Sequence, residues 1–523
     1  AWSLAKALQA LHHPASGQTL DRETEGDHPA WRRLKAEELL AQQVSQHQAR
    51  MQRDVLRAPC LTPLSAAGGV AQAGSLVKDL QERLPFALTA AQKRVLEDIR
   101  QDLLKPRPMH RLLQGDVGSG KTVVAALAAA QAMAAGWQCA LMTPTELLAE
   151  QHFRNLTNWL QELLAPLGAE VAWLAGGQGK RVRNEMLERI ADGRAWLVVG
   201  THAVIQSQVQ FKRLGLAIID EQHRFGVAQR LTLRQKNQAQ PEGDDGLEPH
   251  LLMMSATPIP RTLAMSHYAD LDVSVIDELP PGRTPVLTKL IAAQRRDDVI
   301  ARIRSQVDEG RQVYWVCPLI EESEALDLVN ATQTHEHLCQ ALPGVTVGLL
   351  HSKLPTPEKK AVMDAFKAGQ LGVLVSTTVI EVGVDVPNAT LMVVEHAERF
   401  GLSQLHQLRG RVGRGSLASV CVLMYDPPEG GLSQAAKARL RAMVDTQDGF
   451  EIAQRDLEIR GPGELLGERQ SGVPMLRFAD VTQDQDLLAW ARATAPLLWQ
   501  SHPEQAKALM QRWLGAKSQF LQV

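Results

Sequence analysis

Short apolar runs alternate with longer amphipathic stretches through most of this chain. Between residues 86 and 282 the runs are Cys139–Met142, Trp196–Val199, Leu216–Ile219 and Leu251–Met254. Each run carries too few polar residues for a half-exposed strand, so the pattern predicts buried strands of a parallel sheet with helices on both faces. Right-handed crossovers would place the loops that follow these strands along one edge of the sheet.

The same alternation begins again after Pro280-Pro281-Gly282, a sequence that breaks both helices and strands. The apolar runs of this part are Val313–Val316, Val345–Leu350, Val373–Val375, Leu391–Val394 and Val420–Met424. Because the two parts share one pattern, we predict an α/β protein with two doubly wound parallel-sheet lobes at residues 86–282 and 283–428.

Helical patterns flank the two predicted lobes. Residues 1–85 include a helical stretch at 31–56, and we predict a helical linker region there. Residues 429–523 are also predicted to be mainly helical, with a break at Gly461-Pro462-Gly463.

Composition narrows the class of protein. The chain has 523 residues, 45% hydrophobic and 22% charged, which is typical of a globular protein with more than one core. No apolar run approaches the roughly 18 residues that span a bilayer, and the five cysteines form no Cys-x-x-Cys pair. We expect a cytoplasmic protein with no membrane association, no zinc site and no disulfide framework. The chain begins with Ala and is interpreted as a fragment of a longer protein.

A glycine-rich loop follows the apolar pair Leu112-Leu113 and opens a predicted helix. Its sequence is Gly115-Asp116-Val117-Gly118-Ser119-Gly120-Lys121-Thr122. In such a loop the backbone N–H groups hold phosphates, the lysine reaches the β- and γ-phosphates, and the threonine ligates Mg²⁺. The sequence therefore predicts a site for ATP and Mg²⁺. The carboxylate of Asp116 would repel phosphates, so we expect it to face outward or toward a cation.

Acidic residues follow the run Leu216–Ile219, in the order Asp220-Glu221-Gln222-His223. At a sheet edge beside a P-loop, Asp220 is predicted to hold Mg²⁺ through its water shell, and Glu221 to orient and deprotonate the attacking water. Gln222 and His223 are candidates for sensing the γ-phosphate.

The segment from Phe86 to Gln92 precedes the P-loop. Thr89 is a predicted helix cap, and the amide of Gln92 is a candidate for bonding an adenine edge, although a plain helix start explains the segment nearly as well. We group Phe86 and Gln92 with the predicted nucleotide-binding residues.

Polar loops rich in hydroxyl groups follow several predicted strands. Because the formal net charge is only −2, any DNA contact has to come from local groups of this kind. Hydroxyls and amides bind a phosphate chain without reading base sequence, although each loop alone is typical of a helix cap. The candidate DNA-contacting residues are Thr143, Pro144, Thr145, Thr201, His202, Ser255 and Thr257 in the first lobe, and His351, Ser352, Thr377 and Thr378 in the second.

A second nucleotide-binding segment lies near the end of the second lobe. It reads Gln407-Leu408-Arg409-Gly410-Arg411-Val412-Gly413-Arg414. Arg411 and Arg414 are the predicted finger residues, because a planar guanidinium can bridge two phosphate oxygens as charge develops. Gln407 is placed in the same catalytic group, and Gly383 and Asp385 are placed with the nucleotide-binding residues. ATP held between this segment and the P-loop would clamp the lobes together, as in a motor.

Taken in order, these motifs resemble the superfamily 2 helicases and translocases over residues 86 to about 426. The acidic tetrapeptide corresponds to a DExH variant, and the arginine segment to the closing motif. The resemblance implies two RecA-like lobes that couple ATP hydrolysis to stepwise movement along a nucleic acid strand.

The segment from Gly449 to Gly472 narrows the resemblance. It is similar to the translocation motif that the RecG family shares with the transcription-repair coupling factor. In those families the motif forms a helical hairpin and loop that convert lobe closure into pulling on duplex DNA. The resemblance implies transmitting roles for Arg439, Arg460 and Gln470.

Two further segments favour the RecG family, namely Trp31–Leu39 and residues 473–523. They resemble the helical segment before its motor and its short carboxyl-terminal region. The family's amino-terminal OB-fold wedge is not found, so the resemblance implies a motor fragment without its wedge. It also implies a bacterial enzyme of DNA repair and recombination that remodels stalled replication forks, Holliday junctions, D-loops and R-loops.

Three alternatives stay open at this point. They are a transcription-repair coupling-type translocase, a DExH RNA helicase, in which the segment 449–472 has no role, and an ATP-gated nucleic-acid-binding platform that does not travel. For the leading hypothesis we expect a monomer that binds branched or duplex DNA, with single-strand-binding protein as a candidate partner.

Overall fold

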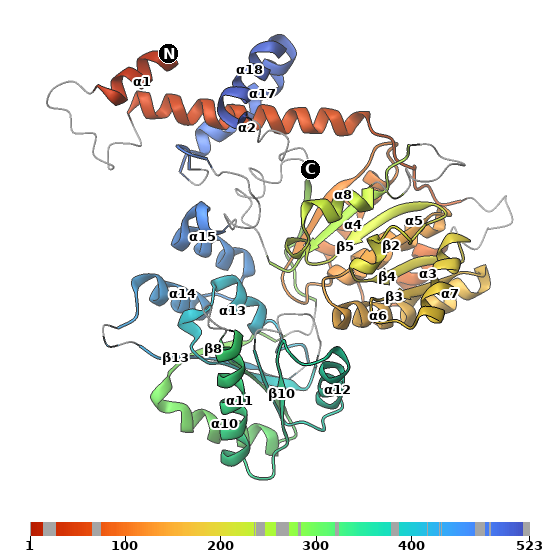
Figure 1. Ribbon diagram of the computed structural model, residues 1–523, viewed down its shortest axis with the longest axis vertical. Helices are drawn as coiled ribbons and strands as arrows, with labels where there is room; N and C mark the ends of the chain where they lie inside the picture. The colour runs from red at the N-terminus through yellow and green to blue at the C-terminus, as the bar shows by residue number, and fades with distance from the viewer. Residues whose placement is uncertain are drawn as a thin grey trace. The chain divides into compact units, whose positions relative to one another are not determined.

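The computed structural model describes residues 2–13, 28–64, 75–234, 236, 246–257, 271–280, 284–318, 324–377, 386–415, 417–427, 429, 431–465, 476–480 and 483–515. The chain divides into two compact units. One is built around four helices, α1 (Leu4–His12), α2 (Pro29–Val55), α17 (Gln485–Ser501) and α18 (Pro503–Leu514). The other holds both β-sheets with their helices (Figure 1).

The first sheet has seven strands in the order β3-β4-β2-β5-β6-β1-β7. They are β1 (His110–Gly115), β2 (Gln138–Met142), β3 (Glu170–Leu174), β4 (Ala195–Gly200), β5 (Leu214–Ile219), β6 (His250–Ser255) and β7 (Asp272–Ile276). The pairs from β3 through to β1 are parallel. Their carboxyl ends therefore share one edge, where the predicted site loops lie.

Helices cover both faces of this sheet. They are α3 (Leu76–Arg83), α4 (Ala90–Leu103), α5 (Lys121–Ala134), α6 (Glu146–Leu164), α7 (Lys180–Ala191) and α8 (Val227–Arg234). Alternate strand residues point to opposite faces, so Cys139 packs in the core with α3 to α6, while Ala140 packs in a second core beside α7. The alanine-rich α5 is buried along almost its whole length, which holds the P-loop against the sheet.

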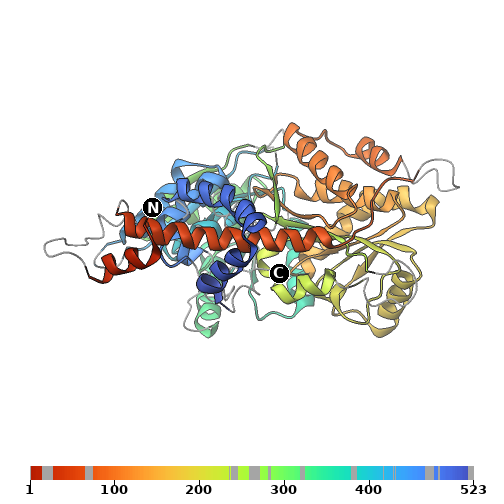
Figure 2. The ribbon, with the colours of Figure 1, turned by 90° about the horizontal axis from the view of Figure 1, so that it is seen from above.

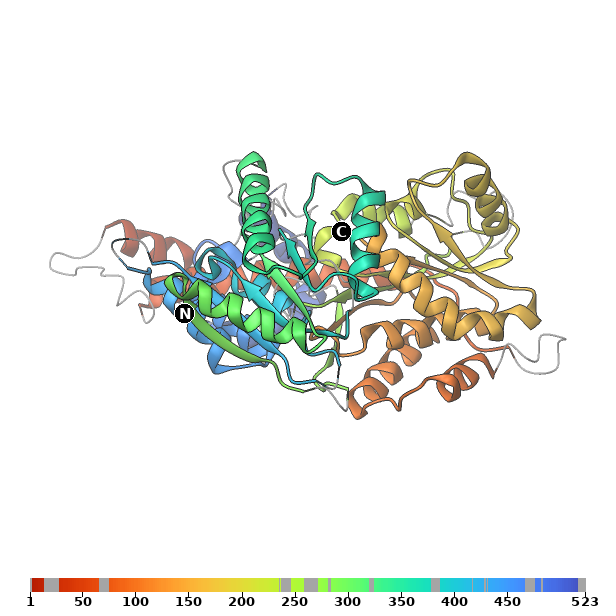
Figure 3. The ribbon, with the colours of Figure 1, turned by 90° about the horizontal axis from the view of Figure 1, so that it is seen from below.

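The second sheet has six strands in the order β10-β11-β9-β12-β13-β8, and its neighbouring strands are parallel. They are β8 (Leu287–Ala292), β9 (Gln312–Val316), β10 (Val347–Leu350), β11 (Val373–Ser376), β12 (Ala389–Val394) and β13 (Val420–Tyr425). One face packs on α10 (Arg296–Asp308) and α11 (Glu324–Ala341), and the other on α12 (Thr356–Lys367) and α13 (Leu402–Arg409). Figure 3 shows α10 and α11 in green and α12 in teal beside the sheet.

Two further helices, α14 (Gln434–Asp445) and α15 (Gly449–Leu465), belong to the same core as α13. Leu440 and Met443 from α14 and Ile452 from α15 are buried beside Leu405 and Leu408 of α13. The hairpin implied by the resemblance therefore begins as two helices anchored on the second lobe and joined by a three-residue turn.

The two predicted parallel-sheet lobes are confirmed, and every apolar run predicted as a strand is one. Four strands are not among the predicted runs, namely β1, which contributes only the apolar pair Leu112-Leu113, and β3, β7 and β8. Strands β3, β7 and β8 lie at the ends of the sheets in the part of the chain that the structure describes. Ser274 interrupts the apolar run in β7, and Thr288 and Lys289 interrupt it in β8, whereas β3 carries the unbroken run Val171–Leu174.

The predicted helix break at Gly461-Pro462-Gly463 is wrong, because α15 continues through these residues to Leu465. A proline inside a helix removes one hydrogen bond and bends the axis, but it does not end a helix that other contacts hold. Here Ile452, Ala453 and Leu457 bury one face of α15. A second internal proline, Pro496, is accommodated in α17 in the same way.

The helical unit depends on contacts between distant parts of the chain. The buried carboxylate of Glu38 accepts hydrogen bonds from the backbone N–H groups of Arg477, Phe478 and Ala479. Lys35 bonds Asp484 at 3.0 Å, and α17 and α18 pack along α2. Figure 2 shows the blue helices lying along the red α2. Among the helices that the structure describes, none is long and apolar enough to cross a membrane.

We predict that Gln138→Ala destabilises the first lobe. Its buried amide donates to Ile190 O and Ala195 O at 2.9 and 2.7 Å and accepts from Arg213 N at 3.0 Å. Losing these partners leaves buried backbone groups unsatisfied and should lower the free energy of unfolding by about 1–3 kcal/mol. Urea unfolding followed by tryptophan fluorescence measures this. Gln208→Ala, at an exposed site, is the control, and equal midpoints for the two variants would contradict the prediction.

Candidate nucleotide site and strand-edge loops

The P-loop joins β1 to α5, and its glycines are required by its shape. Gly118 and Gly120 have φ of 78° and 88°, in the left-handed region that residues with a Cβ atom rarely adopt. A Cβ atom added to Gly115 would lie 2.5 Å from Ser119 Oγ. The loop therefore leads directly into the amino terminus of α5, where free backbone N–H groups suit a phosphate.

Lys121, the first residue of α5, is buried against this loop. Its Nζ donates to the carbonyl oxygens of Gly115 and Asp116 at 2.8 and 3.0 Å. Burial lowers the pKa of Lys121, whereas the carboxylates of Glu221, Asp220 and Asp116 oppose that shift. The ammonium lies among acids and carbonyls within reach of the loop, as phosphate binding requires.

Gln92 supports the P-loop from α4. Its Nε2 donates to Ser119 O at 2.8 Å, and its Oε1 accepts from the N–H of Thr89 at 2.9 Å. Thr89 is the helix cap that the sequence predicts. Each end of the Gln92 amide thus makes one bond within the chain, and an adenine contact would use its second N–H or the second lone pair of Oε1. The ring of Phe86, just before α4, is exposed.

Asp220 ends β5 beside Lys121. Its Oδ2 lies 2.7 Å from His152 Nε2 on α6, and its Oδ1 accepts from the N–H of Glu221 at 3.0 Å. Burial works against ionisation, but the His152 bond and the nearby Lys121 charge hold the pKa of Asp220 below its ordinary value. A carboxylate kept ionised in a buried site suits the hydrated Mg²⁺ that the motif implies.

Glu221 has the opposite character. Burial and the neighbouring Asp220 raise its pKa, and the charges of Lys121 and Arg411 only partly oppose this. Its backbone has φ of 51°, a conformation that costs energy in a residue other than glycine. Two adjacent acids with pKa values displaced in opposite directions are typical of an ion-binding group next to a general base.

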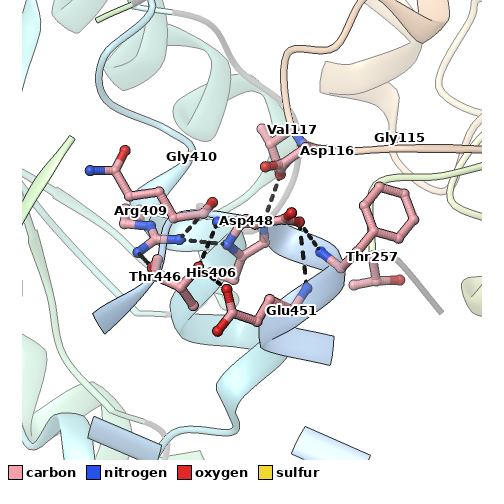
Figure 4. A network of polar contacts seen from close by, with 12 residues as sticks. Gly115, Asp116, Val117, Thr257, His406, Arg409, Gly410, Thr446, Asp448 and Glu451 are labelled. Atoms are coloured by element: carbon pink, nitrogen blue, oxygen red, sulfur yellow. Dashed lines mark hydrogen bonds and ion pairs between the residues drawn. The ribbon is translucent and has the colours of Figure 1, made fainter. Parts of the chain in front are cut away.

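The arginine segment of the second lobe lies against the P-loop. Asp116 Oδ1 lies 2.6 Å from His406 Nε2 on α13, and a Cβ atom added to Gly410 would lie 2.7 Å from Val117 Cβ. Figure 4 shows this contact between His406 and Asp116. The expectation that the Asp116 carboxylate faces outward or toward a cation is partly met, because it faces an imidazole rather than the inside of the loop.

Both predicted finger arginines act on the same site. Arg411 is buried, and its charge partly opposes the rise in the pKa of Glu221. Arg414, whose Nε donates to Gly410 O at 3.1 Å, adds to the lowering of the pKa of Lys121 that burial causes. Gln407 is buried on α13. The two nucleotide-binding segments predicted from sequence therefore face each other.

The hydroxyl-rich loops of the first lobe all follow its strands. Thr145 caps α6, and Thr143 Oγ1 donates to Thr145 O at 3.0 Å, across Pro144. Ser255 Oγ and Thr257 Oγ1 bond each other at 2.9 Å after β6. After β4, Thr201 is buried and His202 is exposed. His223 lies in the 3-10 turn Gln222–Arg224.

Several of the candidate ligand residues carry a buried polar atom that has no hydrogen-bond partner within the described part of the chain. They are Ser119 Oγ, Thr201 Oγ1, His351 Nδ1 and Thr377 Oγ1. Buried polar groups are normally paired, so such atoms at two sheet edges are consistent with a ligand that supplies their partners. Ser352 follows His351 after β10. Thr378, Gly383, Asp385 and Gln470 lie outside the described residues.

Arg439 and Arg460 lie on the two helices of the hairpin. Arg439 Nη2, on α14, donates to Glu398 O at 3.0 Å. Arg460 lies on α15, partly exposed.

Three residues that complete the site were not predicted as functional, namely His152, His406 and Arg409. His152 contacts an acid 68 positions away, a pairing that no local pattern reveals. His406 and Arg409 are three residues apart on one helix, so only that spacing hinted that they act together.

Comparison with known proteins first defines the class. Residues 89–266 match the DEAD/DEAH box helicase family, and residues 294–416 match the helicase conserved C-terminal domain. Two such lobes, with a P-loop on one and facing arginines on the other, form the motor of an ATP-dependent helicase. Residues 446–513 match a third description, ATP-dependent DNA helicase RecG, domain 3, C-terminal.

Individual relatives define the family. The ATP-dependent DNA helicase RecG of Escherichia coli O157:H7 is 54% identical over 98% of this chain and 71% of its own length. That of Haemophilus influenzae is 51% identical over 99% of this chain and 72% of its own. A structure of RecG bound to a three-way DNA junction has a TM-score of 0.67 at 41% identity, covering 88% of this chain and 57% of that one. The chain belongs to the RecG family.

We predict that Glu221→Gln stabilises the nucleotide-free protein at pH 7. A carboxyl whose pKa is raised by folding costs stability where both folded and unfolded forms are ionised, and costs nothing where both are protonated. The variant should therefore melt a few degrees higher at pH 7, with a gain that shrinks as the pH falls toward 4.5, the ordinary pKa. Thermal melts from pH 5 to 8 measure this. Glu188→Gln, at an exposed site, should change nothing. A lower melting point for Glu221→Gln at pH 7 would contradict the assignment.

Proposed function

We propose that this chain is an ATP-driven translocase that moves on duplex DNA and remodels branched DNA, including stalled replication forks, Holliday junctions, D-loops and R-loops. The contact of the arginine segment with the P-loop carries the proposal, because it joins two lobes at one nucleotide site. The relative whose structure holds a three-way DNA junction supports branched DNA as the substrate class.

The site supports a definite division of roles. Lys121 and the P-loop amides would hold the phosphates, and Thr122 with Asp220 would hold Mg²⁺, which would supply charge neutralisation at the phosphates. Glu221 orients the attacking water and accepts its proton as the water oxygen bonds the γ-phosphorus and ADP leaves. Arg411 and Arg414 stabilise the charge that develops on the transferred group.

The proposed DNA path follows the carboxyl ends of the strands in both lobes. The hydroxyls of Thr201 and Thr377 have no hydrogen-bond partner among the residues that the structure describes. They are suited to backbone phosphates, which give binding without base sequence preference. Arg439 and Arg460 on α14 and α15, together with Gln470, would transmit lobe movement to the duplex.

We propose that the protein acts in the cytoplasm as a monomer, with lobes at residues 86–282 and 283–428 between the helical regions 1–85 and 429–523. Single-strand-binding protein is the proposed protein partner.

The other functions considered make different demands. A DExH RNA helicase requires that single-stranded RNA stimulate ATP turnover more than duplex DNA does. A platform that opens and closes without travelling would hydrolyse ATP but never strip a third strand from a triplex. The match of residues 446–513 to a RecG domain favours the DNA motor.

We predict that Arg411→Ala lowers DNA-stimulated ATP turnover by about 10³ to 10⁵, the usual contribution of an arginine finger. The guanidinium is buried near Glu221, so no solvent cation replaces it. Steady-state kcat with junction DNA measures the loss. Arg181→Ala, a change at an exposed arginine of the first lobe, should keep full turnover. A loss below tenfold for Arg411→Ala would exclude the finger role.

We predict that Arg460→Ala keeps DNA-stimulated ATP turnover but loses triplex displacement, because Arg460 lies on α15 rather than at the nucleotide. Both activities are measured on the same preparation. Arg441→Ala, an exposed position of α14, is the matched control. If both activities of Arg460→Ala fall together with its melting temperature, the residue is needed for folding and the transmitting role is rejected.

A further inference from the structure

A continuous row of hydrogen bonds runs from the P-loop to the turn between α14 and α15 (Figure 4). Asp116 Oδ1 lies 2.6 Å from His406 Nε2, and His406 Nδ1 lies 3.0 Å from Arg409 Nη2. Arg409 Nη1 then donates to the carbonyls of Met443 and Thr446 at 3.0 and 2.9 Å. The row thus links the first lobe, through α13, to the start of the hairpin.

The direction of each bond follows from the groups themselves. A guanidinium donates hydrogen bonds and accepts none, so His406 Nδ1 must be the acceptor from Arg409. A neutral imidazole then carries its proton on Nε2, which donates to the Asp116 carboxylate. The ring is buried, so both of its nitrogens are held in one tautomer and one orientation.

Arg409 joins this row to the end of α14. The carbonyls of a helix's last turn have no N–H partners within the helix, and a cation there also meets the negative end of the helix dipole. Arg409 is buried and bonds Met443 O, Thr446 O and, at 3.3 Å, Gln447 O. The next residue, Asp448, accepts from Phe450 N at 2.8 Å and so begins α15.

We propose that Asp116, His406 and Arg409 are positioning residues that report contact between the P-loop and the second lobe to the turn at residues 446–448. The inference rests on the proposed motor function. When α13 is seated on the P-loop, Asp116 fixes the His406 ring, and the ring offers Arg409 its acceptor. When the lobes part, His406 loses Asp116, Arg409 loses an oriented acceptor, and the end of α14 is held less firmly.

The test separates polarity from size at His406. His406→Phe keeps a ring but cannot bond Asp116 or Arg409. His406→Gln keeps a donor nitrogen and an acceptor oxygen bonded to one carbon, as the two ring nitrogens of histidine are. Hydrogen exchange at residues 446–451 is measured with and without a non-hydrolysable ATP analogue. In the unaltered protein the analogue should slow exchange there. His406→Phe should abolish this response and His406→Gln should retain most of it, while His337→Phe, an exposed site on α11, should behave as the unaltered protein.

The same variants are compared for third-strand displacement per ATP hydrolysed. His406→Phe should lower this ratio by at least about fivefold, the lower end of usual coupling between sites. If His406→Phe melts early, Arg409→Lys replaces it, because an ammonium keeps the charge but cannot bond the imidazole and two carbonyls in the fork geometry. An unchanged ratio and an unchanged exchange response in either variant overturn the proposal.

The control with unaltered protein keeps the two proposals apart. If the unaltered protein hydrolyses ATP with DNA but displaces no third strand, the proposed motor function is wrong. The exchange measurement still tests the role of Asp116, His406 and Arg409. If displacement occurs but the analogue does not change hydrogen exchange at residues 446–451, the proposed role of Asp116, His406 and Arg409 is wrong and the motor function stands.

Discussion

The site exists because a segment of the second lobe reaches the phosphate loop of the first. Gly410 has no side chain, which lets the backbone of the arginine segment approach Val117, and the carboxylate of Asp116 meets the imidazole of His406 beside it. With that approach, Arg411 and Arg414 act on Glu221 and Lys121. Without it, the acids and Lys121 of the first lobe and the arginines of the second lobe would lie apart. A change at the nucleotide would then not reach the second lobe.

The acids of the first lobe show how one environment produces two chemical characters. Asp220 and Glu221 are adjacent, Asp220 is buried and pairs with His152, and Glu221 is half-buried. Burial and the negative charge of the ionised Asp220 make ionisation of Glu221 harder, which raises the pKa of Glu221. Glu221 has a left-handed backbone conformation, which costs energy in a residue other than glycine. The packing of the buried strand β5, which ends just before Asp220, offsets this cost.

The sequence predicts features that depend on local residues, but not those that depend on contacts between distant parts of the chain. Central strands such as β5 are buried on both faces, so they appear as unbroken apolar runs, and the glycine spacing of the P-loop follows from its backbone. Edge strands such as β8 are partly exposed and leave no such run. The partners of Asp116 and Asp220 come from elements far along the chain, so their identity depends on tertiary structure. The break predicted at Gly461-Pro462-Gly463 does not occur, because the buried face at Ile452, Ala453 and Leu457 stabilises α15 against the local preference of these residues.

The buried bonds of Glu38 also order events during synthesis. Its backbone partners lie about 440 positions further along the chain, after both lobes. At ribosomal rates of about 5–20 residues per second, α2 emerges roughly 20–90 seconds before the segment that satisfies its carboxylate. The face of α2 that carries Glu38 therefore stays exposed while both lobes are synthesised. During this interval a chaperone or a neighbouring nascent chain can bind that face.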